Sequence, residues 1–203
     1  MYVPADFLQN DIDEIEQFLQ GNSFGTIVSM NEIQLPIATH LPFLIERNGE
    51  DFILEGHMAK ANQQSELLKK GKNVLLIFQG PNAYVSSAVY DHPNVPTWNY
   101  QSVHIHGTIE PMTEVELHTH LGKMVSLHEG KRETPLNYDT LPSEMLKSYS
   151  QEIIGFKIVS FNMEAAYKLS QNRNEADYQN IIDDLSKDKK NRSIIEAMNR
   201  SKK

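Results

Sequence analysis

The stretch NVLLIFQGPNAYVSSAVY, residues 73–90, decides how the rest of the chain is interpreted. Its first part, residues 73–80, is almost wholly apolar and predicts a strand. Gly80, Pro81 and Asn82 are turn-forming residues that predict a tight turn. Residues 83–90 then form a second run that favours β structure. The stretch therefore predicts two successive strands joined by a turn.

Hairpin-linked strands continue on both sides of this stretch. Asn48-Gly49 is a strong hairpin signal, and Thr113 with Glu116 forms a capping box at the start of a helix. Regular β-α-β alternation and a GxGxxG motif are both absent, so a Rossmann sheet is not expected. The pattern predicts a mainly β chain with inserted helices, arranged as a small antiparallel barrel. Further strands are expected at 24–29, 35–47, 51–59, 101–112 and 155–170, and helices at 10–21 and 63–70.

Composition excludes several classes of protein. The 203 residues are 39% hydrophobic, enough to bury a sizeable core, and they include no cysteine. Disulfides, thiolate zinc sites and cysteine nucleophiles are therefore excluded. The N-terminal MYVPADF does not resemble a signal peptide, and no apolar run approaches the roughly 20 residues needed to cross a bilayer. We expect a soluble, cytoplasmic protein with no membrane partner.

Charge is distributed unevenly along the chain. The net charge is -8. Residues 187–203 contain seven basic and two acidic residues, a charge of +5, so the other 186 residues carry -13. We divide the chain into a barrel domain with inserted helices, residues 1–173, and a charged helical tail, residues 174–203. Residues 187–203 are interpreted as a solvated, fraying helix end or as a weak contact to DNA or RNA.

The segment EGHMAKAN, residues 55–62, is the densest candidate site. Its small residues leave room for close approach to the backbone, Lys60 supplies a cation, and Asn62 can cap the following helix. This combination suits a bound phosphate, although a polar strand-to-helix turn explains the same residues. Other candidates, each also explained as a capped turn or an interrupted edge strand, are Thr39 and His40 before Pro42, Ser86, and Gln171 with Arg173 in KLSQNR.

The eight histidines do not predict a metal site. His104 and His106 alternate in a strand and share a face, but no acidic partner stands at ligand spacing. His118 and His120 lie on a predicted helix, where positions two apart point about 200° apart and cannot chelate one ion. No GxSxG motif or Ser-His-Asp set can be assembled from the spacing, so no catalytic residue is assigned.

Seven motifs follow one another along the chain: MYVPADF, ATHLPF, GHMAKAN, IFQGPNAYVS, VPTWNY, IIGFKI and KLSQNR. In this order they resemble the PaiB family of FMN-binding negative transcriptional regulators. The resemblance implies the FMN-binding split barrel of flavin reductases and pyridoxamine-phosphate oxidases, built as a homodimer with ligand sites at the interface. It also implies FMN-binding roles for ten residues: Thr39, His40, Leu41, Lys60, Asn62, Ser86, Trp98, Asn99, Gln171 and Arg173.

The resemblance also implies a function for Trp98, the single tryptophan of the chain: it would cover a bound ligand. Trp98 and Asn99 would lie on a loop that closes over a planar ligand, held by the partner subunit, because an indole stacks on a flavin ring without needing a charge. Lys60 would face the phosphate of FMN. Thr39, His40 and Leu41 would border the ring.

The chain departs from the family pattern at two places. Gln63 and Ser65 stand where the family commonly has proline and tryptophan, and residues 87–89 replace a proline-serine-tryptophan run. Loss of two aromatic contacts predicts that FMN binds weakly and is lost on purification. The resemblance implies a repressor of protease and sporulation genes. The alternatives are a flavin reductase-like oxidoreductase and a haem-binding split barrel with His40, His57 or His104 as axial ligand.

Overall fold

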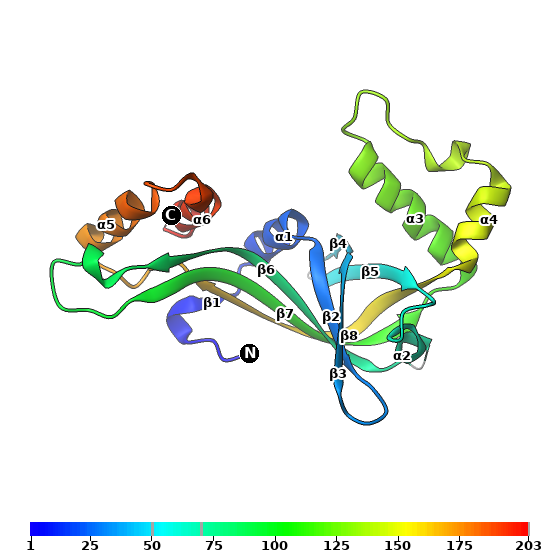
Figure 1. Ribbon diagram of the computed structural model, residues 1–203, viewed down its shortest axis with the longest axis horizontal. Helices are drawn as coiled ribbons and strands as arrows, with labels where there is room; N and C mark the ends of the chain where they lie inside the picture. Colours follow the sequence, from blue (N-terminus) through cyan, green and yellow to red (C-terminus); the bar gives the residue numbers. More distant parts are fainter. Residues whose placement is uncertain (50, 70, 203) are drawn as a thin grey trace. The chain divides into compact units, whose positions relative to one another are not determined.

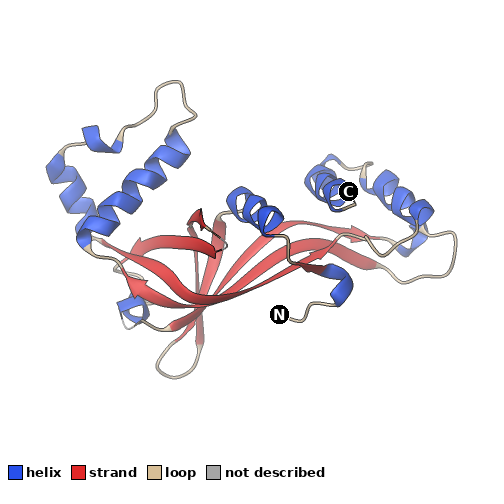
Figure 2. Cartoon of the chain, turned by 180° about the vertical axis from the view of Figure 1, so that it is seen from behind, coloured by secondary structure: helices blue, strands red, loops and turns tan. Residues whose placement is uncertain are grey.

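The computed structural model describes residues 1–49, 51–69 and 71–202, and these residues form one eight-stranded sheet (Figure 1, Figure 2). The strand order is β3-β2-β6-β7-β8-β5-β4, and β1 pairs with β8. All the pairs with an assigned register are antiparallel. The strands are β1 Leu8–Gln9, β2 Phe24–Met30, β3 Pro36–Pro42, β4 Leu44–Asn48, β5 Asp51–Ala59, β6 Asn73–Val85, β7 Thr97–Pro111 and β8 Ile153–Lys168.

Six α-helices and four short 3-10 helices accompany the sheet in the described part of the chain. The α-helices are α1 Ile12–Gly21, α2 Ser65–Lys69, α3 Glu114–Glu129, α4 Ser143–Gln151, α5 Glu175–Leu185 and α6 Arg192–Ser201. The 3-10 helices are η1 Ala5–Phe7, η2 Ser87–Val89, η3 Tyr138–Thr140 and η4 Lys189–Asn191. The predicted mainly β class with inserted helices is therefore confirmed.

The chain folds as two compact units that are not consecutive in sequence. The first unit comprises residues 1–18, 79–104 and 163–203, and the second comprises residues 19–78 and 105–162. The strands β6, β7 and β8 each contribute residues to both units. The division predicted after Arg173 stays a prediction, and residues 174–203 belong to the first unit.

The second unit contains the barrel-like part of the sheet. Its β4–β5 hairpin turns at Gly49, whose φ of 67° is readily adopted by glycine, as the Asn48-Gly49 signal predicts. The end strand β3 also contacts β5, and a Cβ on Gly56 would lie only 3.0 Å from Leu41 Cδ1. Phe43 packs edge-on against the rings of Phe78 and Phe156 in the core. Glycine at position 56 therefore allows the two strands to approach closely.

The predicted turn at Gly80-Pro81-Asn82 is wrong, because β6 continues through it from Asn73 to Val85. A Cβ on Gly80 would lie 2.5 Å from Phe18 Cε2. Glycine stands there so that the ring of Phe18 can lie against the strand. Pro81 lies beyond the residues that pair with β2, which end at Ile77, so its missing N–H leaves that ladder intact.

The predicted run 35–47 is interrupted in the structure. β3 ends at Pro42 and β4 begins at Leu44, while Phe43 between them is fully buried. The backbone N–H of Phe43 donates to the carbonyl of Ser23 at 2.9 Å instead of continuing a ladder. The expectation that Pro42 marks an edge strand or an interrupted ladder is confirmed, since β3 ends the sheet order.

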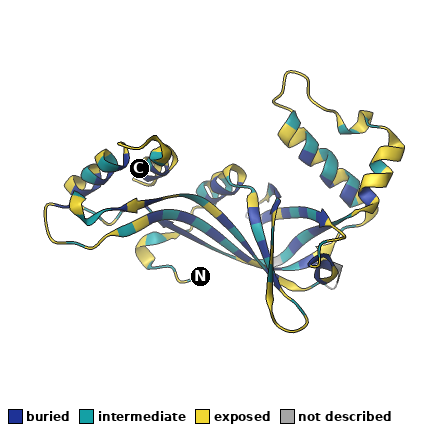
Figure 3. Cartoon of the chain, in the orientation of Figure 1, coloured by how far each residue is buried: buried dark blue, intermediate teal, exposed yellow. Residues whose placement is uncertain are grey.

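The C-terminal helices pack through an apolar face, so the interpretation of residues 187–203 as a solvated, fraying end is wrong. In the first unit α5 and α6 contact each other, and Figure 3 shows buried residues along both. Tyr178, Ile181, Ile194 and Met198 are all at most 4% exposed. Helical spacing of apolar residues was the correct signal, and burial of that face stabilises the pair.

Candidate functional site

Lys60 lies just beyond the end of β5, at the edge of a small hollow in the second unit. Its ammonium donates a hydrogen bond to the carbonyl of Gln151, and its side chain is otherwise exposed. The hollow has a volume of about 330 Å³ and includes the side chains of Thr113, Glu114 and Ser150. The hydroxyls of Thr113 and Ser150 already donate to Glu116 Oε2 and to the carbonyl of Lys147. Lys60 is therefore the group in this hollow that can attract a phosphate, and the carboxylate of Glu114 opposes it.

Thr39 and Asn62 are brought together, as the candidate site requires. Asn62 Nδ2 donates to Thr39 Oγ1 at 3.0 Å, and Asn62 Oδ1 accepts the backbone N–H of Gln64 at 2.9 Å just before α2. Asn62 therefore joins β3 to the segment that leads into α2. The exposed ring of His40 stacks on Phe24, and Leu41 is buried in the core.

The other five predicted site residues lie in the first unit. Ser86 Oγ accepts the N–H of Ala88, and Trp98, which is 54% exposed, meets Tyr84 edge-on at a centroid distance of 5.9 Å. Trp98 thus presents about half of its surface to solvent, as expected for a residue that covers a planar ligand. The indole is not part of an apolar core.

Asn99 lies with Trp98 in β7, so the loop expected for these two residues is wrong, and it bonds to the turn after β8 that contains Gln171 and Arg173. Asn99 is fully buried, accepts from Ser170 Oγ at 3.0 Å and donates to Met198 Sδ at 3.4 Å. Gln171 folds back onto the backbone of Leu169 and Tyr167, so its amide is occupied. The guanidinium of Arg173 lies over the ring of Tyr90.

The positions where the chain departs from the family pattern differ in their surroundings. Ser65 is fully buried and donates to the carbonyl of Lys60 at 2.8 Å, so position 65 faces the interior. Ala88 lies in η2 and is exposed. A tryptophan introduced at Ser65 would therefore disturb the core, whereas one at Ala88 would lie at the surface.

The sequence analysis missed a partly buried chain of hydrogen-bonding groups, Glu55–His120–His57, in the second unit. His57 Nδ1 lies 2.9 Å from His120 Nε2, and His120 Nδ1 lies 3.3 Å from Glu55 Oε2. His120 is fully buried. Burial, and then the charge of His120, lowers the pKa of His57 to about 4, while the hydrogen bond from His120 lowers the pKa of Glu55. Its only sequence signal was the alternation of Glu55 and His57, which places both side chains on one strand face.

The paired histidines on α3 point to different partners, as their spacing predicts. His118 Nδ1 lies 2.9 Å from the hydroxyl of Tyr138, whereas His120 faces β5. Within residues 1–49, 51–69 and 71–202, no group of three or more metal-ligating side chains is arranged to hold an ion.

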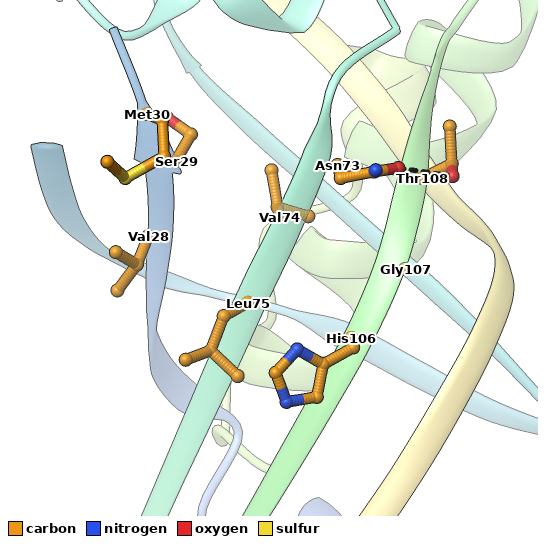
Figure 4. A pocket seen from close by; sticks show the side chains of 9 residues that line it. All are labelled: Val28, Ser29, Met30, Asn73, Val74, Leu75, His106, Gly107 and Thr108. Atoms are coloured by element: carbon orange, nitrogen blue, oxygen red, sulfur yellow. Dashed lines mark hydrogen bonds between the residues drawn. The ribbon is translucent and has the colours of Figure 1, made fainter. Parts of the chain in front are cut away.

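A separate open hollow of about 450 Å³ lies over β2, β6 and β7 in the second unit (Figure 4). Val28 and Leu75 form its apolar walls, and His106 projects beside Leu75. Thr108 Oγ1 donates to Asn73 Oδ1 at 3.0 Å at one end. None of the ten predicted site residues is among the nine described residues that line it.

The family described as "Putative FMN-binding domain" matches residues 1–160. The chain is 43% identical over 185 residues to "Protease synthase and sporulation protein PAI 2" of Bacillus subtilis (strain 168), covering 91% of this chain and 89% of that protein. It is 24% identical over 238 residues to an uncharacterized protein of Aspergillus fumigatus, covering 92% of this chain and 91% of the other.

Solved structures share the fold at low identity. The FAD and haem binding protein from Mycobacterium smegmatis superposes with a TM-score of 0.62 at 15% identity, covering 79% of this chain and 73% of that one. The protein Rv2991 from Mycobacterium tuberculosis gives a TM-score of 0.59 at 17% identity, covering 86% and 95%. In the described part of the chain, none of the helices is both long and apolar enough to span a membrane.

Proposed function

The chain belongs to the FMN-binding domain family, and on this premise we propose that it is a negative regulator of protease synthesis and sporulation built on an FMN-binding split barrel. The observation that carries the proposal is the similarity to the Bacillus subtilis protein, which extends over nearly the whole of both chains. The protein acts in the cytoplasm, where its target genes lie.

Complementation tests this function. A Bacillus subtilis strain that lacks its PAI 2 protein would be made to express this chain, and secreted protease activity and spore yield would be measured. Expression should lower both. The proposal fails if neither changes while the Bacillus subtilis protein, expressed to the same level, lowers both.

FMN is the cofactor that we propose, held weakly in the second unit. Lys60 would hold the phosphate in the hollow of about 330 Å³, and Thr39, His40 and Leu41 would border the ring. Lys60 supplies a cation for the phosphate, while the engaged hydroxyls of Thr113 and Ser150 and the carboxylate of Glu114 in the same hollow favour weak rather than tight binding. Bound FMN would supply a redox-active group. Trp98 of a second copy would cover the ring.

Fluorescence titration tests the flavin site because Trp98 is the single indole of the chain. FMN should quench Trp98, and Lys60→Ala should weaken the titration about tenfold, the loss expected when one charge-assisted contact disappears. Lys189→Ala, an exposed lysine of the first unit, is the matched control and should leave the titration unchanged. Absence of quenching up to millimolar FMN would rule out the site.

A DNA contact through the C-terminal helices forms the third part of the proposal. The basic side chains are highly exposed: 75% for Lys187, 78% for Lys190 and 84% for Arg192. Each pairs with a nearby carboxylate at 2.9 Å, and exposed pairs of this kind are weak enough to give way to DNA phosphates.

The test of this contact must preserve the fold. Deleting residues 187–203 would remove the buried side chains of Ile194 and Met198, so loss of binding would not identify the charges. Replacing Lys187, Lys189, Lys190 and Arg192 with glutamine keeps the buried face. Binding to a target promoter should weaken, and the slope of log affinity against log salt should fall by about 0.9 for each lost phosphate contact. An unchanged slope would exclude the tail from DNA binding.

We also propose that the protein is a homodimer. The loop between β2 and β3 exposes large apolar side chains, with Ile33 at 73% and Leu35 at 55%. An exposed apolar group of this kind is typical of a surface that is covered by a partner. Light scattering at micromolar concentration should give twice the mass of one chain, and a monomer would contradict the proposal.

A further inference from the structure

An open groove of about 590 Å³ lies in the second unit between β4, α3 and η3. Its apolar walls include Leu44, which is buried, and Leu127, which is 48% exposed. None of the ten residues with an implied role in FMN binding is among the described residues that line the groove. The groove is therefore separate from the hollow beside Lys60.

Side-chain interactions hold the walls of this groove together. His118 Nδ1 lies 2.9 Å from the hydroxyl of Tyr138, which joins α3 to η3. The ammonium of Lys123 lies 2.6 Å from Glu46 Oε2, which joins α3 to β4. A Cβ on Gly122 would lie 3.5 Å from Tyr138 Cδ1, so the ring of Tyr138 lies close to the helix. All five residues line the groove, and its shape is therefore fixed by contacts on both sides of α3.

The groove carries a negative charge that is not neutralised within it. Its charged side chains are those of Glu46, Asp139 and Lys123, and the ammonium of Lys123 pairs with Glu46. In the described part of the chain, the carboxylate of Asp139 forms no ion pair. With His118 counted as uncharged, two carboxylates and one ammonium leave a net charge of -1. A ligand of positive charge would complement this lining.

The ring of Tyr138 stands next to this charge. Burial, and then the negative charge of Asp139, raises the pKa of Tyr138. The phenol therefore stays protonated and uncharged at neutral pH. An uncharged aromatic ring beside a carboxylate attracts a cation through its quadrupole as well as through the charge of its neighbour.

We propose that the groove binds an organic cation that carries an apolar chain, the chemistry of a primary alkylammonium ion. The ammonium group would contact the carboxylate of Asp139 and the ring of Tyr138, and the chain would lie along Leu44 and Leu127. An anion of the same size is repelled by the net charge of the groove, and a neutral molecule gains only the apolar contacts. The site stands whether or not FMN binds at Lys60.

NMR of protein labelled with ¹³C in the histidine rings tests the site. The chain contains eight histidines, and the His118 signal would be identified by its loss in His118→Gln. Butylammonium chloride would be titrated at constant pH and constant ionic strength, with sodium chloride as the balancing salt. The His118 signal should shift to saturation. Absence of a saturable shift beyond the effect of sodium chloride overturns the proposal.

Two molecules of nearly the same shape separate charge from apolar contact. Butanol lacks the positive charge and butyrate carries a negative one, so both should bind about fivefold more weakly than butylammonium or worse, the loss expected when an exposed charge pair is missing. Butanol or butyrate that binds as tightly as butylammonium contradicts the proposal.

Removing the unpaired carboxylate should weaken binding. Asp139→Asn keeps the shape of the side chain, and because Asp139 is exposed the fold should be unchanged, which circular dichroism checks. Butylammonium should bind this variant about fivefold more weakly. Asp6→Asn, which removes an exposed carboxylate of the first unit, is the matched control and should leave the affinity unchanged. Equal affinity in wild type and Asp139→Asn sinks the site.

The ion pair between Lys123 and Glu46 supplies two variants with effects of opposite sign. Lys123→Gln changes the net charge of the groove from -1 to -2 and leaves Glu46 free for the ligand, so butylammonium should bind about threefold more tightly. Glu46→Gln makes the groove neutral and should weaken binding. The two side chains are 43% and 40% exposed, and an exposed pair of this kind contributes little to folding. Changes of affinity in the same direction would show that the groove does not recognise charge, and the proposal would fail.

Discussion

The free energy of unfolding of the protein should decrease as the pH falls from about 7 to about 5, and replacing His57 with glutamine should make this decrease smaller. In the native protein the ring of His57 lies against His120, and its pKa is about 4 rather than 6.5. Between these two values the unfolded chain binds a proton that the native chain does not. The native state is therefore destabilised as the pH falls through this window.

The magnitude follows from the size of the shift. If the pKa of His57 is 6.5 in the unfolded chain and about 4 in the native protein, the free energy of unfolding falls by about 2 kcal/mol between pH 7 and pH 5. Partial exposure of the ring reduces this loss to about 1 kcal/mol. Glu55, whose pKa is also lowered, stabilises the protein above its ordinary value of 4.5 and loses that contribution as the pH falls further. Lys123 and Lys157 are the other charged groups near Glu55.

Urea unfolding followed by circular dichroism at several pH values measures the effect. Glutamine at position 57 can still accept a hydrogen bond from His120 and does not titrate. His57→Gln should lose less than about 0.3 kcal/mol between pH 7 and pH 5. His128→Gln, an exposed histidine on the same helix as His120, should behave as wild type. Equal pH dependence in His57→Gln and wild type would refute the reasoning.

Three further outcomes are expected from unfolding measurements at neutral pH. Gly56→Ala should destabilise by about 1–3 kcal/mol, because its Cβ would lie 2.7 Å from Phe156 Cζ, whereas Gly21→Ala, with no atom within 4 Å, should cost far less. Thr113→Ala should cost about 1 kcal/mol, because it removes the N-cap of α3. Gln64→Leu should cost about 1–3 kcal/mol, because buried acceptors that its amide now satisfies, including Ile27 O and Ser29 Oγ, lose their donor. Absence of these losses would contradict the packing and hydrogen bonds described above.

Features that depend on a few neighbouring residues could be predicted from the sequence. The capping box of Thr113 and Glu116 forms as expected, and Asn48-Gly49 turns the β4–β5 hairpin. The apolar spacing in residues 174–203 correctly indicated helices. In each case the residues that determine the feature are only a few positions apart along the chain, so the local sequence alone specifies it.

Features that depend on distant residues were decided by the tertiary structure. Gly80 is a residue type that favours turns, but it lies within β6, and glycine is needed there because the ring of Phe18 from α1 lies against the strand. His57 and His120 are 63 residues apart. No local pattern predicts such pairs, because burial and charge depend on which surfaces meet when the strands are brought together. The sequence by itself determined the elements and the family of the chain, and only the packing of those elements decided which polar groups share a buried environment.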